Sequence, residues 1–229
     1  MRIHLTFLIL LTTAVVSQAQ DMMPLLRKVR ARIDKVNDYV AEGKMKTDVV
    51  FIKVPLGKVK VYFKKPNRFR LKKDGGISVL PKGGVSVNMS GIVNPNDVTA
   101  LDAGETTLSG SKVRIVKLLP ISDESEIVLS TLYIDEEKLL VRKAVTTTRE
   151  NGTFEVAMAY GQYAEYALPD KVVFSFNTRE YKIPKGITLE FEDGEKATGN
   201  DKLKNRKGRV ELTYERYTIN QGLSDSVFK

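Results

Sequence analysis

The sequence predicts a mainly β protein in which one N-terminal helix precedes a single antiparallel sheet. Two observations predict it. A stripe of apolar residues with helical spacing begins near residue 22, and the segments after residue 43 alternate between apolar and polar side chains. A sheet that is apolar on one side must bury that side, by curling on itself or under a helix. No linker rich in Pro, Gly or Ser divides the 229 residues, so we expect one domain.

Residues 1–19 have the pattern of a secretory signal peptide. Arg2 gives a positive start, an apolar stretch follows as far as Val16, and Ser17-Gln18-Ala19 fits a small-x-small cleavage site. The apolar stretch is shorter than the roughly 20 residues that cross a bilayer. We therefore predict cleavage, which leaves residues 20–229 as one domain outside the cytoplasm; an uncleaved anchor is the alternative. The chain has no cysteine for a lipoprotein anchor, so we expect no lipid anchor.

The first element after the signal is predicted as a helix. Asp21 is a suitable N-cap, Pro24 falls in the first turn, and Gly43 is a suitable stop. The opposite face of this helix is mostly basic. We expect it to pack on the sheet with its basic face in solvent; a helix that lies on a membrane surface is the alternative. Its apolar residues recur every three or four positions, at Met22, Leu25, Leu26, Val29, Ile33, Val36 and Val40.

Strands follow the helix at intervals of about ten residues, a spacing typical of all-β folds. The segment 58–64 alternates strictly, with Val59, Val61 and Phe63 on one face and lysines on the other. A strand at 45–51 is expected before it, with Pro55-Leu56-Gly57 as the turn. Further strands are predicted at 68–72, 77–80, 85–89, 112–119, 126–134, 139–148, 153–160, 171–177, 187–192 and 209–218.

Turn residues separate these strands. Pro66-Asn67, Asp135-Glu136-Glu137 and Glu150-Asn151-Gly152 are typical turn sequences. Asn94-Pro95-Asn96-Asp97, followed by Val98 and Leu101, predicts a short capped helix in the middle of the chain. The polar, basic segment 193–207 is expected to be a long hairpin loop, with a partner-contact loop as the alternative.

The composition excludes most kinds of catalytic mechanism. The chain has no Cys, and its one His, His4, lies in the predicted signal peptide. Without Cys or His, a mature protein cannot assemble a Ser-His-Asp or Cys-His nucleophile, or the usual zinc site. Asp123, Glu124 and Glu126 form an acidic group in a turn that has no aromatic platform for a sugar, so we interpret them as solvated. We therefore expect a protein that is not an enzyme and that binds neither metal nor cofactor.

The charge balance makes anionic partners plausible but does not favour nucleic acid. The formal net charge is +9, and loss of Arg2 with the signal lowers it to +8. The lysines are spread over many strands and loops, and a secreted protein seldom meets nucleic acid. We expect no nucleic-acid partner; an anionic membrane surface or an acidic protein is more compatible with the charge.

The apolar face of the sheet is the remaining candidate site. Either it forms an ordinary closed core, or it lines an incompletely filled cavity that holds an apolar ligand such as an acyl chain. Burial of each methylene group favours such binding by about 0.8 kcal/mol. The candidate ligand-binding residues are Val59, Val61, Phe63, Phe69, Leu71, Ile115, Leu129, Tyr133, Phe154, Val156, Met158, Phe174, Leu212 and Tyr214.

Four segments, taken in order, resemble the LolA-like periplasmic lipoprotein-carrier family. They are a strand, basic-basic-Pro turn and aromatic strand at 61–70, a strand, Asp-turn and strand at 133–143, a Leu-Pro segment at 160–171, and the tail at 217–228. The resemblance covers most of residues 21–229. It implies an unclosed antiparallel barrel that is covered by the N-terminal helix and by a short lid helix near 95–103.

The resemblance also implies a function. The protein would carry acyl chains of lipoproteins, or another envelope lipid, through the periplasm toward the outer membrane without covalent chemistry. An inner-membrane donor protein and an outer-membrane acceptor protein would be its partners, its contact with membranes would be transient, and it would be a monomer. Lys65 stands where well-studied carriers have the Arg that latches the lid, and lacks the planar fork of Arg. The alternative is a non-transporting envelope sensor or protein-binding module on the same fold.

Overall fold

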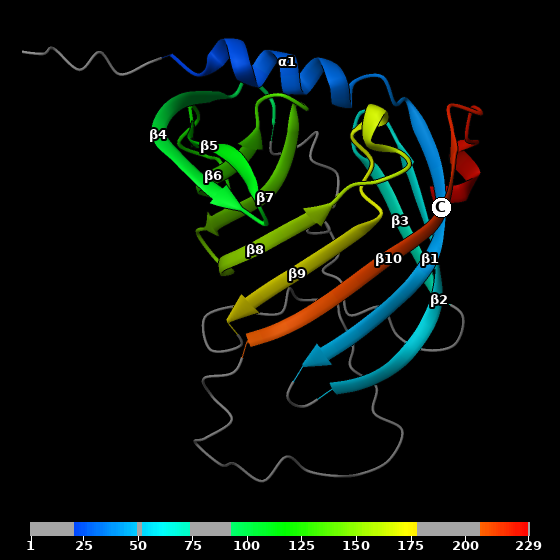
Figure 1. Ribbon diagram of the computed structural model, residues 1–229. Helices are drawn as coiled ribbons and strands as arrows, with labels where there is room; N and C mark the ends of the chain where they lie inside the picture. Colours follow the sequence, from blue (N-terminus) through cyan, green and yellow to red (C-terminus); the bar gives the residue numbers. More distant parts are fainter. Residues whose placement is uncertain (1–20, 50–51, 74–92, 178–206, 229) are drawn as a thin grey trace, which may run out of the picture.

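The computed structural model describes residues 21–49, 52–73, 93–177 and 207–228 (Figure 1). These residues form one antiparallel sheet of ten strands, in the order β3-β2-β1-β10-β9-β8-β7-β6-β5-β4. The sheet is strongly curved, and β3 and β4 are its two edges, so it is not closed. The predicted class, an unclosed antiparallel barrel with an N-terminal helix, is confirmed. The strands are β1 Asp38–Val49, β2 Ile52–Lys64, β3 Arg68–Lys73, β4 Val98–Leu108, β5 Ser111–Pro120, β6 Ile127–Asp135, β7 Leu140–Thr148, β8 Gly152–Ala159, β9 Lys171–Asn177 and β10 Lys207–Ile219.

Helix α1, Met23–Ile33, lies across one end of the curved sheet (Figure 1). Pro24 is in its first turn, as predicted, and the carboxylate of Asp21 accepts a hydrogen bond from the backbone N–H of Met23 at 2.9 Å. Leu26 and Val29 are buried on the face toward the sheet. The amphipathic stripe therefore packs the helix on the β structure, as the sequence predicted. Two short 3-10 helices, η1 Ala164–Tyr166 and η3 Asp225–Phe228, complete the described elements.

The helix is shorter than predicted, because its expected second half is strand β1. The apolar residues of β1 that point inward are Tyr39, Ala41 and Met45, which follow the period of two of a strand. Tyr and Val also favour strands. The role predicted for Gly43 is wrong as well. Instead of ending a helix, Gly43 lies at a register shift where a Cβ atom would overlap the backbone carbonyl of Thr213.

The turn predicted at Pro55-Leu56-Gly57 lies inside strand β2 instead. Met45 pairs with Gly57 and Thr47 pairs with Val54, so two residues of β2 face one residue of β1. This irregularity is where a strand tolerates proline, since Pro55 has no N–H to donate to the sheet.

The short helix predicted near 95–103 is wrong. Asn94–Asp97 is a turn in which the backbone N–H of Asp97 donates to the carbonyl of Asn94, and β4 begins directly after it at Val98. Residues 98–101 pair with 117–120 of β5. The Asx-type turn and the β-branched residues after it favour a strand over a helix. Within the described residues, the only α-helix over the sheet is α1.

The remaining predictions follow the structure closely where the structure describes them. The strands predicted at 68–72, 112–119, 126–134, 139–148, 153–160, 171–177 and 209–218 correspond to β3 and β5–β10. The turns at Pro66-Asn67, at 135–137 and at 150–152 are confirmed. The signal peptide, the strands at 77–80, 85–89 and 187–192, and most of the loop at 193–207 lie outside the described residues.

Candidate functional site

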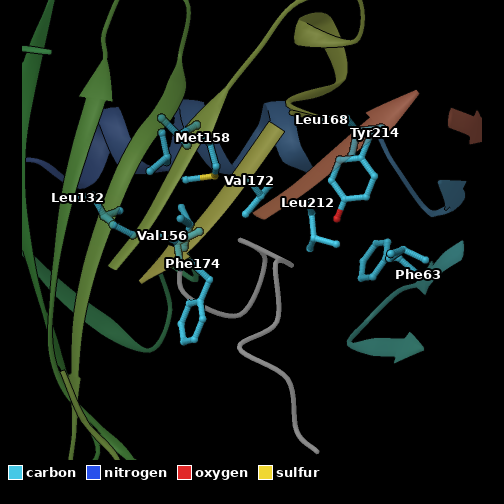
Figure 2. Close-up of a cluster of buried hydrophobic side chains, with 14 of the residues drawn as sticks. Phe63, Leu132, Val156, Met158, Leu168, Val172, Phe174, Leu212 and Tyr214 are labelled. Atoms are coloured by element: carbon cyan, nitrogen blue, oxygen red, sulfur yellow. The ribbon is translucent and has the colours of Figure 1, made fainter. Parts of the chain in front are cut away.

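The apolar side chains of neighbouring strands face one another across the concave side of the sheet. Val156 on β8 lies opposite Ala144 on β7 and Phe174 on β9, and Phe174 lies opposite Val210 on β10. None of these four is more than 4% exposed. The ring centroids of Phe154 and Phe174 are 5.5 Å apart. Figure 2 shows side chains of β2, β6, β8, β9 and β10 projecting toward the same interior.

The apolar surface continues through β10 and β1 to β2. Leu212 pairs with Met45, Ala41 pairs with Val61, and both strands of each pair turn these residues inward. Met45, Ala41 and Val61 are at most 1% exposed. The concave side therefore presents one continuous apolar surface from β7 to β2.

The structure places most of the predicted ligand-binding residues on this surface. Phe69 and Leu71 are partly buried and pack against it from β3. The structure shows that these residues share the concave side of the sheet. Their role in binding a ligand stays a prediction. The residues that are buried on the concave side are Val59, Val61, Phe63, Phe154, Val156, Met158, Phe174, Leu212 and Tyr214.

The face predicted for Ile115, Leu129 and Tyr133 is wrong. Val116 pairs with Leu132, and both are fully buried on the concave side, so their neighbours in sequence point outward. Tyr133 lies on the outer side, where the ammonium of Lys143 is 4.4 Å from the centre of its ring. In β5 and β6, apolar residues occupy consecutive positions, so alternation alone does not identify the buried face.

Sequence reasoning missed several residues of the surface. Tyr39 and Ala41 were assigned to a helix. Tyr217 was missed because a register shift in β10 near Glu42 and Gly43 of β1 turns both Tyr214 and Tyr217 inward, three positions apart. Leu132 and Ile134 stand at alternate positions of β6, which the sequence does show. The other set of alternate positions, which includes Leu129 and Tyr133, is equally apolar, so the sequence does not show which set is buried.

Aromatic residues gather at the end of the surface that is nearest to α1 and η1. The ring of Tyr217 lies 5.4 Å from that of Tyr39, 5.0 Å from that of Tyr163 and 5.2 Å from that of Tyr214. The hydroxyl of Tyr217 donates a hydrogen bond of 2.7 Å to the carbonyl of Pro169. Burial raises the pKa of Tyr39, Tyr214 and Tyr217 above the usual range of tyrosine, so these hydroxyls stay protonated.

Two buried hydroxyl groups on the concave side have no hydrogen-bond partner. They are the side-chain oxygens of Tyr214 on β10 and Thr47 on β1, and this holds for the part of the chain that the structure describes. A buried polar atom without a partner costs about 1–3 kcal/mol. Such atoms call for a partner such as a water molecule or a ligand.

Polar contacts near the C-terminal end of α1 hold it over the sheet. The guanidinium of Arg32 donates to the carbonyl of Ala164 in η1 at 3.2 Å. At the C-terminal end, the ammonium of Lys65 donates to the backbone carbonyl of Asp34 at 2.6 Å and lies 3.2 Å from its carboxylate. Burial opposes ionisation of Asp34, but hydrogen bonds from Arg30 and Lys65 outweigh it and lower the pKa of this carboxyl. Lys65, the predicted lid latch, thus contacts the helix end.

A separate cavity of about 310 Å³ opens on the outer side of β7, β8 and β9. The β4–β5 turn lines it with Leu108 and Ser109, and Arg142 and Lys171 add positive charge. Both cations are already paired, Arg142 with Asp135 at 2.9 Å and Lys171 with Glu211 at 2.7 Å. Of the residues that line this cavity, only Met158 also belongs to the apolar surface.

Among the described residues, no group of three or more His, Cys, Asp or Glu side chains lies close enough together to hold a metal ion. None of the helices in this part of the chain has both the length and the apolar character needed to cross a membrane.

Comparison with solved structures gives the class of the fold. An outer membrane lipoprotein-sorting domain from Vibrio parahaemolyticus, itself a candidate assignment, is 11% identical, with a TM-score of 0.56 over 90% of this chain and 95% of that one. A DUF1329 family protein from Desulfovibrio piger is 12% identical, with a TM-score of 0.55 over 92% and 98%. A LolA superfamily protein from Nitrosomonas europaea is 10% identical, with a TM-score of 0.51 over 92% and 98%.

The chain therefore has a LolA-like fold, which confirms the resemblance seen in the sequence. At these identities the likeness is one of fold alone. A scan against protein-family models finds no match, and a search of curated proteins finds no significant one.

Proposed function

We propose that the protein binds the acyl chains of lipoproteins, or of another envelope lipid, against the concave side of its sheet and carries them through the periplasm. The observation that carries the proposal is the continuous apolar surface from β7 to β2 under α1. Removal of a hydrocarbon chain from water favours binding by about 0.8 kcal/mol per methylene. No bond is made or broken in this function.

The open sheet supports binding of a guest, because a curved sheet with free edges can change its curvature more easily than a closed barrel. The helix over the end of the sheet supports a gated interior. Its buried residues Leu26 and Val29 cover apolar surface, while side-chain hydrogen bonds through Arg30, Arg32 and Lys65 attach it. A lid attached by side-chain hydrogen bonds can open at a small free-energy cost.

The partnerless hydroxyls of Tyr214 and Thr47 favour an amphiphile over a pure hydrocarbon as the guest. Each would donate a hydrogen bond to a carbonyl or carboxylate oxygen of the ligand. A guest of this class is an acyl chain with its ester or acid group. Both hydroxyls would then have hydrogen-bond partners in the complex.

The location and the partners belong to the same proposal. The signal-like pattern of residues 1–19 supports export, and the missing cysteine supports a form without a lipid anchor. A carrier of this kind receives its cargo from an inner-membrane donor and gives it to an outer-membrane acceptor. N-terminal sequencing of the protein from the envelope of its host should begin at Gln20.

The direct test is native mass spectrometry of protein purified from its host without detergent, combined with titration of a fluorescent acyl probe. An adduct that extracts into chloroform and contains acyl chains supports the proposal. A clean mass for the free protein, together with no uptake of the probe, contradicts it and favours the sensor or protein-binding alternative.

A matched pair of substitutions tests where the probe binds. Ala144→Leu adds volume on the concave side of β7, where Ala144 is fully buried, and Ala157→Leu makes the same change on the outer side of β8. We expect Ala144→Leu to weaken probe binding and Ala157→Leu to leave it unchanged. Circular dichroism of both variants controls for misfolding, since overpacking costs about 1–3 kcal/mol.

A further inference from the structure

Three pairs of like-charged residues face each other on the outer side of β1, β2 and β3. Lys44 lies directly opposite Lys58, Lys60 opposite Lys72, and Lys64 opposite Arg68. The residues between them in β2, such as Val61, point inward, so these six cations share the outer side. We call this surface the basic face.

The basic face keeps an excess of positive charge. Like charges directly opposite each other in a sheet are destabilising. Glu215 contacts Lys44 at 2.6 Å, and Glu42 contacts Lys60 at 3.0 Å. Asp225 of η3 contacts both Lys64 at 2.7 Å and Arg68 at 2.6 Å. Three carboxylates therefore contact four of the six cations.

The other two lysines of the basic face have no carboxylate in contact. Among the described residues, Lys58 makes no ion pair, and the ammonium of Lys72 lies 5.5 Å from the centre of the Tyr62 ring instead. Both lysines are exposed. An anionic partner would satisfy these charges and relieve the repulsion within the pairs.

An exposed leucine lies beside this charge. Leu56 in β2 is 61% exposed, two residues before Lys58, at the irregularity that Pro55 makes in the strand. Cations bind the headgroups of anionic lipid, and an aliphatic side chain among them enters the boundary between headgroups and acyl chains. Charge alone fits an acidic protein equally well, but the exposed leucine favours a bilayer.

We propose that the basic face docks the protein on a membrane surface that contains anionic phospholipid, with Leu56 as the apolar contact. This docking is peripheral and reversible, because it rests on exposed charges that salt screens. It goes beyond acyl-chain binding and does not depend on it, since the basic face and the apolar interior are on opposite sides of the same strands.

Vesicle flotation tests the proposal directly. The protein is mixed with vesicles of phosphatidylcholine alone, or of phosphatidylcholine with phosphatidylglycerol. We expect binding to the anionic vesicles only, and its loss when salt of about 1 M shortens the Debye length to roughly 3 Å. Equal binding to both kinds of vesicle overturns the proposal. So does binding to soluble polyglutamate without binding to vesicles, which indicates an acidic protein partner.

Two double variants separate the basic face from overall charge. Lys58→Glu with Lys72→Glu reverses two charges on the face, and Lys117→Glu with Lys138→Glu makes the same charge change on β5 and in the β6–β7 turn. The first pair should weaken vesicle binding at least about tenfold. The second should weaken it much less, and an equal loss in both overturns the proposal. Acyl-probe titration of the same variants reports separately on the interior.

A single tryptophan tests the apolar contact, because the chain has no Trp of its own. Leu56→Trp should shift its emission to the blue on anionic vesicles, and Val128→Trp, at an exposed site on β6, should not. Vesicle binding without a shift at position 56 would contradict the predicted contact.

Discussion

The ammonium of Lys65 donates a hydrogen bond to the backbone carbonyl of Asp34 at 2.6 Å, which ties the β2–β3 turn to the end of α1. The same ammonium lies 3.2 Å from the Asp34 carboxylate. This lysine thus holds the C-terminal end of the helix together with the hydrogen bond from Arg32 to Ala164. The bond connects the element that covers the sheet with the strands that form its edge.

Lys65→Met should loosen this end of the helix. The variant keeps the aliphatic stem and loses the charge-assisted hydrogen bond, so we expect a stability loss of about 1 kcal/mol. Hydrogen exchange of residues 30–36 should be faster, and acyl-probe exchange should be faster too. Lys112→Met is the control, because its pair with Glu105 is at an exposed lysine, where ion pairs contribute little. Unchanged exchange in Lys65→Met would mean that the contact does not hold the helix.

The Asp34 carboxyl should make this attachment sensitive to acid. Its pKa in the folded protein is lowered from 3.8, so ionised Asp34 stabilises the fold above that value, and this contribution is lost as the pH falls through the lowered pKa. Asp34→Asn should therefore be less stable than the parent protein at neutral pH, and the difference should shrink below pH 3.8. Urea unfolding at several pH values measures it. A difference in unfolding free energy between the two proteins that does not change with pH would contradict the lowered pKa of Asp34.

Leu132→Ala and Leu129→Ala test which face of β6 is buried. Leu132 is fully buried on the concave side, so we expect a loss of about 2–5 kcal/mol in the free energy of unfolding. Leu129 points outward and is only partly buried, so its truncation should cost less than about 1 kcal/mol. Chemical denaturation of both variants measures the contrast, and the opposite order would restore the alternation predicted from the sequence.

Removal of the tyrosine hydroxyls should have opposite effects at two neighbouring positions. The Tyr214 hydroxyl has no partner in the described structure, so Tyr214→Phe should keep or raise the stability of the free protein by up to about 1 kcal/mol. Tyr217→Phe removes the hydrogen bond to Pro169 and should cost about 1–3 kcal/mol. Thermal unfolding distinguishes them. Tyr214→Phe should also bind an acyl probe with a free carboxylate more weakly, and a destabilised Tyr214→Phe would show that the hydroxyl has a partner after all.

The sequence by itself determined the class of this fold. Strict alternation in segments such as 58–64 can be satisfied only by strands with one buried face, and the stripe from Met22 to Ile33 only by a helix on that face. The buried side of segment 58–64 in β2 was readable for the same reason, because lysine or tyrosine occupies every second position there. The resemblance to LolA-like proteins came from the order of these elements.

Only the tertiary structure decided where the alternation of buried and exposed residues along a strand shifts by one position. Register shifts turn Tyr214 and Tyr217 inward together, make Pro55 part of a strand, and place Gly43 against the backbone of Thr213. Each depends on how two strands distant in sequence pair, and a local pattern contains no information about its partner. The same is true of the basic face, since Lys58 and Lys44 are ordinary strand residues until the register places them opposite each other.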